Sequence, residues 1–286
     1  MGTRAPAAAP LETGVLLPPI PFATATGQRN GSRMILIRLE VTDGIALVTL
    51  GNPPVNAQPM QIIEKLTDAF DAISDRSDVQ VAVLTGAGKV FSAGADLKNR
   101  PALDTPGARW KRNRVVREVS YCIIECSKPV IAAVNGPALG AGLGLVASCD
   151  IIVASRDAVF GLPEIDVGLM GGGKHAQRIL PHSLVRRMIL TGYRASAKEL
   201  YRRGIIEACL PADELMPFVM AMAASIAAKS PLAVALAKDS MRAIENMTLR
   251  DGYRYEQGNT AKLAETEDAR EAIRAFKEKR IPHFTG

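Results

Sequence analysis

The chain contains 286 residues, of which 48% are hydrophobic and 22% charged, a composition typical of a globular protein with a substantial core. Its net charge of +6 would suit an anionic partner, but the basic residues are dispersed and aromatic residues make up only 5% of the chain. These values favour a phosphorylated small molecule over a nucleic acid as the partner.

The cysteines, histidines and apolar runs restrict the chemistry and the compartment. The four cysteines have no metal-binding spacing and the three histidines stand in no HExxH or triad context, so we expect no metal site. No apolar run reaches the ~18 residues of a membrane span, and no membrane association is expected. Reduced thiols and the lack of a recognisable secretion signal predict a cytoplasmic protein.

Residues 1–33 differ in composition from the rest of the chain. They are rich in Ala, Pro, Thr and Gly, contain Glu12 as their only acid, and cannot supply a hydrophobic core. We therefore expect this segment to be a disordered tail. A transit peptide and an extension upstream of Met34 are both compatible with its composition.

Strand and helix patterns alternate from Met34 onward. MILIRLEV and IALVTL predict two strands joined by the turn TDG, and residues 58–75 predict a helix with one apolar face. VAVLTG predicts a third strand, and the next helix carries an apolar stripe from Val115 to Cys126. PVIAAVN and IIVAS predict buried strands on either side of the glycine-rich segment GPALGAGLGLVAS, which we expect to start a helix.

The C-terminal part shows helical patterns alone. A stripe from Leu215 to Ile226, the segment PLAVALAKDSMRAI and a charged amphipathic segment ending near EKR each predict a helix. Strands that alternate with helices, followed by helices alone, indicate the α/β class. We expect an α/β core over residues 34–220 and a helical region over residues 221–286.

Two loops of small residues carry the first sign of a site. SAGAD (92–96) and LGAGLG (139–144) each follow an apolar strand and lead toward a helix. Backbone N–H groups at a helix start lack intrahelical partners, and the helix dipole favours negative charge there. Two such ends facing one another would hold a phosphate or an oxyanion. The specific phosphate-binding patterns are missing, and close packing of a helix on a sheet is the alternative reason for the glycines.

Six segments, in the same order along the chain, resemble those of one known family. They are NPPVNA (52–57), FSAGADLK (91–98), KPVIAAVNGPALGAG (128–142), CDIIVAS (149–155), FGLPEIDVGL (160–169) and AFKEKR (275–280). Through them the chain resembles the crotonase superfamily, the enoyl-CoA hydratase/isomerase proteins, from about Met34 to its C-terminus. The resemblance implies a crotonase-like spiral of ββα units. Its C-terminal helical region would cover the pocket and mediate assembly into homo-trimers or hexamers.

The resemblance also implies an active site for an acyl-CoA thioester. Family members hold the thioester carbonyl oxygen between two backbone N–H groups, which correspond to Ala95 and Ala141 in this sequence. Donors fixed where negative charge develops lower the barrier to enolate formation. The acid/base carboxylate of the family corresponds to Glu164, whose pKa we expect to be raised by neighbouring apolar side chains such as Phe160 and Leu162.

Further positions correspond to residues that bind the substrate and its CoA group in the family. These are Ala93, Asp96, Leu97, Lys98, Lys89, Gly140, Phe276 and Lys279. Phe276 and Lys279 would reach the ligand of a neighbouring subunit, and the two loop lysines would lie near the CoA phosphates. A solvated surface charge is the other interpretation of each lysine. Coenzyme A enters as part of the substrate, so no separate cofactor is expected.

One departure from the family pattern decides which reactions are expected. Hydratases of the family carry a second Glu one helical turn after the second oxyanion donor, and this chain has Gly144 there. Without that carboxylate, the candidate reactions are double-bond isomerisation with one base, slow hydration, decarboxylation and thioester hydrolysis. A non-catalytic binding protein of the same fold, with RNA as one possible partner, is the alternative outside enzymes.

Three other polar residues stand near the expected pocket. The segment MGGGKHAQR introduces Lys174 and His175 at a helix start, where either would supply a second proton-transfer group or shape acyl specificity. Asp166 would lie on the same side as Glu164 if the segment joining them is extended. A solvated polar rim is the alternative interpretation of all three residues.

Overall fold

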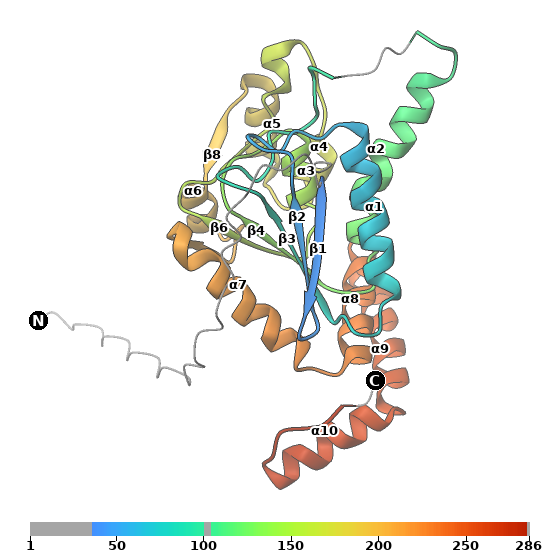
Figure 1. Cartoon of the computed structure of the whole chain (residues 1–286). Helices are drawn as coiled ribbons and strands as arrows, with labels where there is room; N and C mark the ends of the chain where they lie inside the picture. Colours follow the sequence, from blue (N-terminus) through green and yellow to red (C-terminus); the bar gives the residue numbers. More distant parts are fainter. Residues whose placement is uncertain (1–35, 100–103, 285–286) are drawn as a thin grey trace, which may run out of the picture. The chain divides into compact units, whose positions relative to one another are not determined.

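The computed structural model describes residues 36–99 and 104–284. Residues from Met34 to Gly286 form one compact unit, whereas the tail expected at residues 1–33 lies outside the described residues. The unit combines a main sheet, a second small sheet and helices (Figure 1). The alternation of strands and helices in its core was predicted from the sequence patterns.

The main sheet contains the five strands that the sequence patterns predicted and a sixth, β9 (Ala208–Leu210), that they did not. β1 (Ile37–Thr42) and β2 (Ile45–Leu50) form an antiparallel hairpin around the turn at Asp43 and Gly44. The remaining strands are parallel, in the order β1-β2-β3-β4-β6-β9. They are β3 (Val81–Gly86), β4 (Val130–Val134), β6 (Ile151–Ser155) and β9 (Ala208–Leu210). β3 and β4 are buried along their whole length, which explains their continuous apolar sequence.

Helices cover both faces of this sheet. α1 (Met60–Asp75) and α2 (Ala108–Ile124) pack against each other on one face, while α7 (Ala212–Ala227) covers the other face (Figure 1). The predicted apolar stripe of α1 is buried, as its helical periodicity requires. α2 ends before Cys126, which the sequence placed on this helix, because the chain turns ahead of Pro129.

A second, smaller sheet was not predicted. It contains β5 (Ala138–Leu139), β7 (Val159–Gly161) and β8 (Arg194–Ser196), and β5 pairs with β7 in parallel. Strands of two or three residues are too short to show a period of two in the sequence. The sheet has a direct role in the site, because the glycine-rich loop leaves β5 and Glu164 follows β7.

Short helices connect the second sheet to the core. α3 (Ala141–Val146) follows β5, and the 3₁₀ segment η1 (Pro163–Val167) follows β7. α4 (Gly173–Ala176), α5 (His182–Thr191) and α6 (Ala197–Arg202) complete this region. The segment that contains Glu164 and Asp166 is therefore a tight helical turn, and the extended conformation considered from the sequence is wrong.

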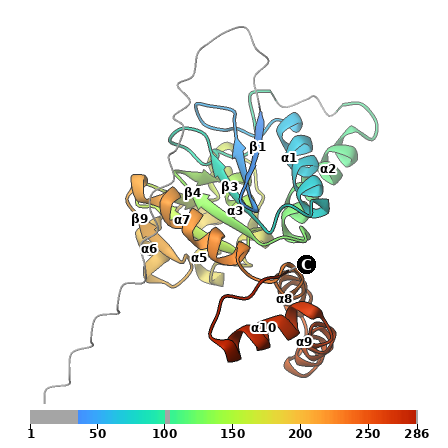
Figure 2. The same ribbon diagram turned by 60° about the horizontal axis from the view of Figure 1, so that its bottom comes forward.

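The C-terminal region contains α8 (Pro231–Ile244), α9 (Leu249–Ala264) and α10 (Glu267–Glu278), which follow one another as a helical group (Figure 2). The boundary expected at residue 220 falls inside α7, a helix that belongs to the sheet. Among the described helices none is long and apolar enough to cross a membrane by itself. Taken together, α7 and α8 pass this test, with a bend of 107° between them.

Candidate active site

The two glycine-rich loops predicted to form the site lie against each other. Leu139 N–H donates to the Ser92 carbonyl at 2.9 Å, and Ser92 N–H donates to the Pro137 carbonyl at 3.0 Å. Gly94 has a φ of +90°, and a Cβ there would lie 2.7 Å from the Leu139 carbonyl oxygen and 3.1 Å from the Ala141 nitrogen. Only glycine permits this approach without displacing the backbone of the second loop.

The segment NPPVNA and the residue after it hold the first loop in place. Ser92 Oγ donates to the Asn56 carbonyl at 2.7 Å and accepts from Gln58 Nε2 at 2.9 Å. Gln58 N–H donates to the Gly94 carbonyl at 2.8 Å, and Asp96 N–H donates to the Gln58 carbonyl at 3.2 Å. These hydrogen bonds use the residues on both sides of Ala95 but not its own N–H group, which therefore remains available as a donor.

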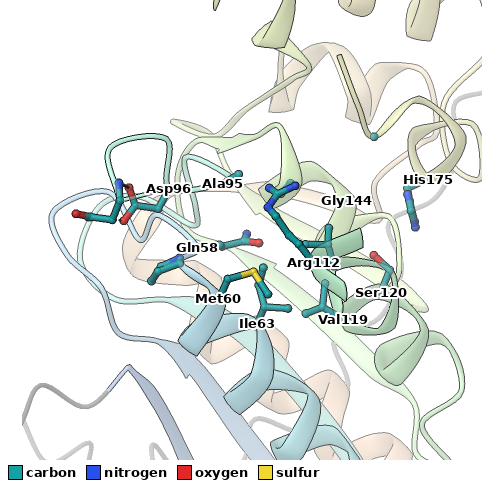
Figure 3. Close-up of a pocket in the computed structure, with 15 residues that line it drawn as sticks. Gln58, Met60, Ile63, Ala95, Asp96, Arg112, Val119, Ser120, Gly144 and His175 are labelled. Carbon is teal, nitrogen blue, oxygen red and sulfur yellow. Dashed lines mark hydrogen bonds between the residues drawn. The ribbon is translucent and has the colours of Figure 1, made fainter. Parts of the chain in front are cut away.

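The available donors are the N–H groups of Ala95 and Ala141. Neither donates to an acceptor within the described residues, and Ala141, as the first residue of α3, cannot do so within its helix. Both alanines line one cavity of about 140 Å³ (Figure 3). Two fixed N–H donors at one cavity can hold an oxygen atom on which negative charge develops.

Glu164 lies directly beside the second loop. A Cβ at Gly140, which has a φ of +55°, would stand 2.7 Å from Glu164 Oε1, so a side chain there would displace the carboxylate. Glu164 Oε2 is buried and has no hydrogen-bond partner in the described part of the chain. Burial raises the pKa of this carboxyl group, as expected. Glu164 is adjacent to the cavity rather than one of the residues that line it.

The surroundings of Glu164 match the predicted apolar wall in part. Phe160 and Leu162 are buried, whereas Ile165 is exposed. The surroundings of the carboxyl group are therefore apolar on the side of β7 and more open to solvent on the side of η1. A buried carboxylate oxygen with no partner is rare; a proton would remove its charge, and a hydrogen-bond donor of the substrate would satisfy it.

The position of the missing second carboxylate opens into the cavity. Gly144 lines the cavity, and a Cβ there would meet no atom within 4 Å. His175 on α4 lines the same cavity, as do Arg112 and Ser120 on α2 (Figure 3). Burial, and secondarily the charge of Arg178, lowers the pKa of the His175 imidazole.

The other two polar candidates lie outside the cavity lining. Asp166 is exposed, and its carboxylate lies against Gly192, 2.7 Å from the place of a Cβ on that residue. The helical turn of η1 thus directs Asp166 away from Glu164. Lys174 is exposed, so of the two residues introduced by MGGGKHAQR only His175 faces the cavity.

The residues predicted to bind the CoA group fall into three places. Asp96 lines the cavity and accepts from the N–H groups of Lys98 and Asn99, both at 3.0 Å. Ala93, Leu97, Lys98 and Lys89 are exposed, whereas Gly140 is buried against Glu164 and does not line the cavity. Phe276, which is 86% exposed, and Lys279 lie at the end of α10 and do not line the cavity.

Sequence reasoning missed the contribution of α2. Arg112, Val116, Val119 and Ser120 line the cavity from this helix. Their spacings of four, three and one place them on one helical face, which is the signal that would have found them. No metal-binding cluster of three or more His, Cys, Asp or Glu residues occurs in the residues that the structure describes.

Comparisons with known proteins identify the family of the chain. A family model for enoyl-CoA hydratase/isomerase matches residues 40–286. The chain is 38% identical over 221 residues to the (7aS)-7a-methyl-1,5-dioxo-2,3,5,6,7,7a-hexahydro-1H-indene-carboxyl-CoA hydrolase of Rhodococcus jostii, covering 77% of this chain and 86% of that protein. It is 35% identical to the 2,3-dehydroadipyl-CoA hydratase of Escherichia coli, covering 85% of this chain and 95% of that protein.

A solved structure of an enoyl-CoA hydratase has the same fold. The crystal structure of an enoyl-CoA hydratase from Bacillus anthracis has a TM-score of 0.83 and 30% identity, and the match covers 88% of this chain and 100% of that chain. The fold and its facing loops thus define a protein of the crotonase class. The chain belongs to the enoyl-CoA hydratase/isomerase family. The predicted family and fold class are confirmed.

Proposed function

We propose that this acyl-CoA-transforming enzyme forms the enolate of its thioester substrate. The N–H groups of Ala95 and Ala141 would bind the thioester oxygen, and Glu164 would move the proton. One observation carries the proposal: two N–H donors without acceptors among the described residues meet at one cavity, beside a buried carboxylate oxygen without a partner. The family membership supports CoA thioesters as the substrate class.

The simplest reaction for this arrangement is double-bond isomerisation. Glu164 in its ionised form removes a proton from the carbon next to the thioester carbonyl, and the electrons of that bond move toward the thioester oxygen. Glu164 then returns the proton to the far end of the conjugated system. The raised pKa brings the acid and base forms of one carboxyl group closer in energy near neutral pH. One carboxylate is enough for this proton shuttle.

A reaction that uses water is the second candidate. The two curated relatives described above are named for such reactions, one as a hydrolase and the other as a hydratase. The open space at Gly144 gives a water molecule room beside the substrate, and His175 and Ser120 are polar groups at the same cavity. Hydration or hydrolysis would then depend on a group other than a second carboxylate.

Glu164→Gln tests the proposed function. We expect isomerisation of 3-butenoyl-CoA to fall by at least ~100-fold, because general acid–base catalysis by one side chain contributes about 10²–10⁴-fold. The affinity for butyryl-CoA, measured by calorimetry, should stay within about tenfold, since the substitution removes a proton-transfer group and few contacts. The conjugated product is followed by its ultraviolet absorbance.

Glu118→Gln, at an exposed position on α2, is the matched control and should leave the isomerisation rate unchanged. Full isomerase activity in Glu164→Gln would disprove the role of this carboxylate. Product analysis by mass spectrometry with 2-enoyl, 3-enoyl and malonyl-type CoA esters separates isomerisation from hydration, decarboxylation and hydrolysis. Tight binding of all three esters without any product would instead support a non-catalytic binding protein.

A further inference from the structure

We propose that His175 binds and deprotonates a water molecule in the space above Gly144, the role that a second carboxylate fills in hydratases. The inference rests on the proposed function, because the attacked substrate is a thioester held at Ala95 and Ala141. In the water-dependent candidate reaction, His175 would then be the base. It also makes the chain capable of two reactions at one site, with Glu164 common to both.

The packing of two short helices carries the inference. Gly172, immediately before α4, lies next to the second loop: a Cβ there would be 2.8 Å from Leu162 Cδ2 and 4.0 Å from the Gly140 carbonyl oxygen. α3 and α4 are in contact, so the two helices start together beside Glu164. One turn further along each helix stand Gly144 and His175, and both line the same cavity.

The imidazole of His175 is prepared to accept a proton. Its ring makes no hydrogen bond with any of the described residues, it is half-buried, and it faces the cavity (Figure 3). The charged group that acts on its pKa is Arg178, on the following turn, whereas Arg112 and Asp96 line other parts of the same cavity. Burial and the Arg178 charge lower its pKa, so the ring is neutral at neutral pH and offers one acceptor nitrogen.

The proposed step is the addition of water to a 2-enoyl thioester. The water oxygen bonds to the double-bond carbon that lies further from the thioester carbonyl, His175 takes one water proton, and the double-bond electrons move to the thioester oxygen held by the two N–H groups. Protonated Glu164 then gives its proton to the carbon next to the thioester, and the electron pair returns from the oxygen. The extra proton on His175 passes through solvent to Glu164, which restores both groups.

Two reactions of short-chain substrates separate this role from the proposed function. Isomerisation of 3-butenoyl-CoA needs Glu164 but no water molecule. Hydration of crotonyl-CoA needs Glu164 together with the water molecule that His175 deprotonates. We expect His175→Ala to lower hydration by at least ~100-fold, the contribution of a general base, and to leave isomerisation within about threefold. His175→Gln, which keeps a hydrogen-bonding group of similar length but accepts no proton, should behave in the same way. Lys174→Ala, at the exposed neighbouring position, should leave both rates unchanged.

Two further measurements exclude a merely structural role. In the His175→Ala background, Gly144→Glu should restore hydration by at least tenfold, since the cavity has room for the side chain. In the wild type, the hydration rate should pass through a maximum with pH: it falls on the acid side as His175 is protonated and on the alkaline side as Glu164 loses the proton that it must donate. Isomerisation, which uses ionised Glu164, should show no fall on the alkaline side. Equal loss of both reactions in His175→Ala and His175→Gln, or an isomerising wild type that does not hydrate, overturns the inference. Isomerisation that is independent of Glu164 overturns the proposed function instead.

Discussion

At the scale of single residues, the site combines groups that are unfavourable for folding. Glu164 buries a carboxylate oxygen without a hydrogen-bond partner among the described residues. Leaving a buried polar group without a partner costs about 1–3 kcal/mol, and more for a charged group. Such a group persists because the site needs it, so its removal should stabilise the fold while abolishing the reaction.

The pH dependence of stability follows from the direction of the Glu164 pKa shift. The folded-state pKa is raised above its ordinary value of 4.5, so between these two values the folded state binds more protons than the unfolded state. The free energy of unfolding therefore decreases as the pH rises through this window. Below 4.5 both states carry the proton and the penalty is absent; above the folded-state pKa it is fully present.

Glu164→Gln should thus raise the thermal midpoint at pH 7 by roughly 2–4 °C, which corresponds to about 1 kcal/mol for a domain of this size. The gain should disappear near pH 4, where the wild-type carboxyl group is protonated. Differential scanning calorimetry at both pH values makes the measurement, with the exposed Glu118→Gln as control. Equal midpoints for Glu164→Gln and wild type at pH 7 would show that burial of this carboxylate is not unfavourable.

At the scale of elements, α3 shows why one glycine-rich stretch serves several purposes. Gly140 leaves room for the Glu164 carboxylate, and Gly142 leaves room for the backbone of the first loop, since a Cβ there would be 2.5 Å from the Ser92 carbonyl oxygen. Gly144 has open space in front of it. Both interpretations offered by the sequence, close packing and ligand approach, therefore apply to different glycines of the same segment.

Gly142→Ala and Gly144→Ala should have opposite effects on stability. Alanine at 142 forces the two loops apart, so we expect a loss of more than ~1 kcal/mol together with loss of isomerase activity. Alanine at 144 meets nothing and removes the conformational entropy cost of a helical glycine, so we expect a gain of about 0.5–1 kcal/mol. Urea unfolding of both variants measures the difference. A stable Gly142→Ala protein with full activity would contradict the packing described for the loops.

The sequence predicted the long elements and missed the short ones for physical reasons. α1, α7 and α8 have enough turns for an apolar stripe to appear, and β3 and β4 are continuous apolar runs. β5, β7 and β8 owe their existence to pairing with distant partners, which no local pattern records. Asp166 is the exposed surface acid that the sequence analysis allowed, and its alternative placement beside Glu164 fails because η1, which packs against α5, is a helical turn.

At the scale of the whole folded unit, the cavity draws together segments far apart in the sequence. α1 and α2 supply its apolar side, the two loops supply the N–H donors, and α4 supplies His175. The motifs at Ala95, Ala141 and Glu164 could be read from the sequence through their resemblance to a family. The position of His175 relative to Gly144 could not, since it depends on how α3 and α4 pack.

Polar contacts attach the C-terminal helices to this core, and those of Lys238 are buried. Lys238 on α8 donates to the carbonyls of Ile123 at 3.2 Å and Lys128 at 2.8 Å, and its ammonium lies 2.9 Å from the Asp150 carboxylate. Arg178, just after α4, pairs with Glu245 at the end of α8 at 3.1 Å. The attachment fixes α8 near the site, and α9 and α10 extend from it.

The exposed apolar residues of α9 and α10 predict self-association. Several large side chains of the helical region are exposed, namely Met247, Leu249, Tyr253, Ile273, Phe276 and Ile281. Exposed apolar residues gathered in one region commonly mark an interface. We propose that this region joins copies of the chain into a homo-trimer or hexamer, as the resemblance to the family implied.

Phe276→Asp should therefore shift the mass measured by light scattering toward a single chain, because it places a charge where an apolar contact is expected. Lys277→Asp, at the next residue of the same helix, is the control: it changes the net charge by more than Phe276→Asp does but removes no apolar side chain. Its mass by light scattering should equal that of the wild type. If Phe276 also reaches the ligand of a neighbouring copy, the affinity for butyryl-CoA should fall in parallel with the mass. A wild type that runs as a single chain at micromolar concentration would disprove the assembly and, with it, the role of Phe276 in a neighbour's site.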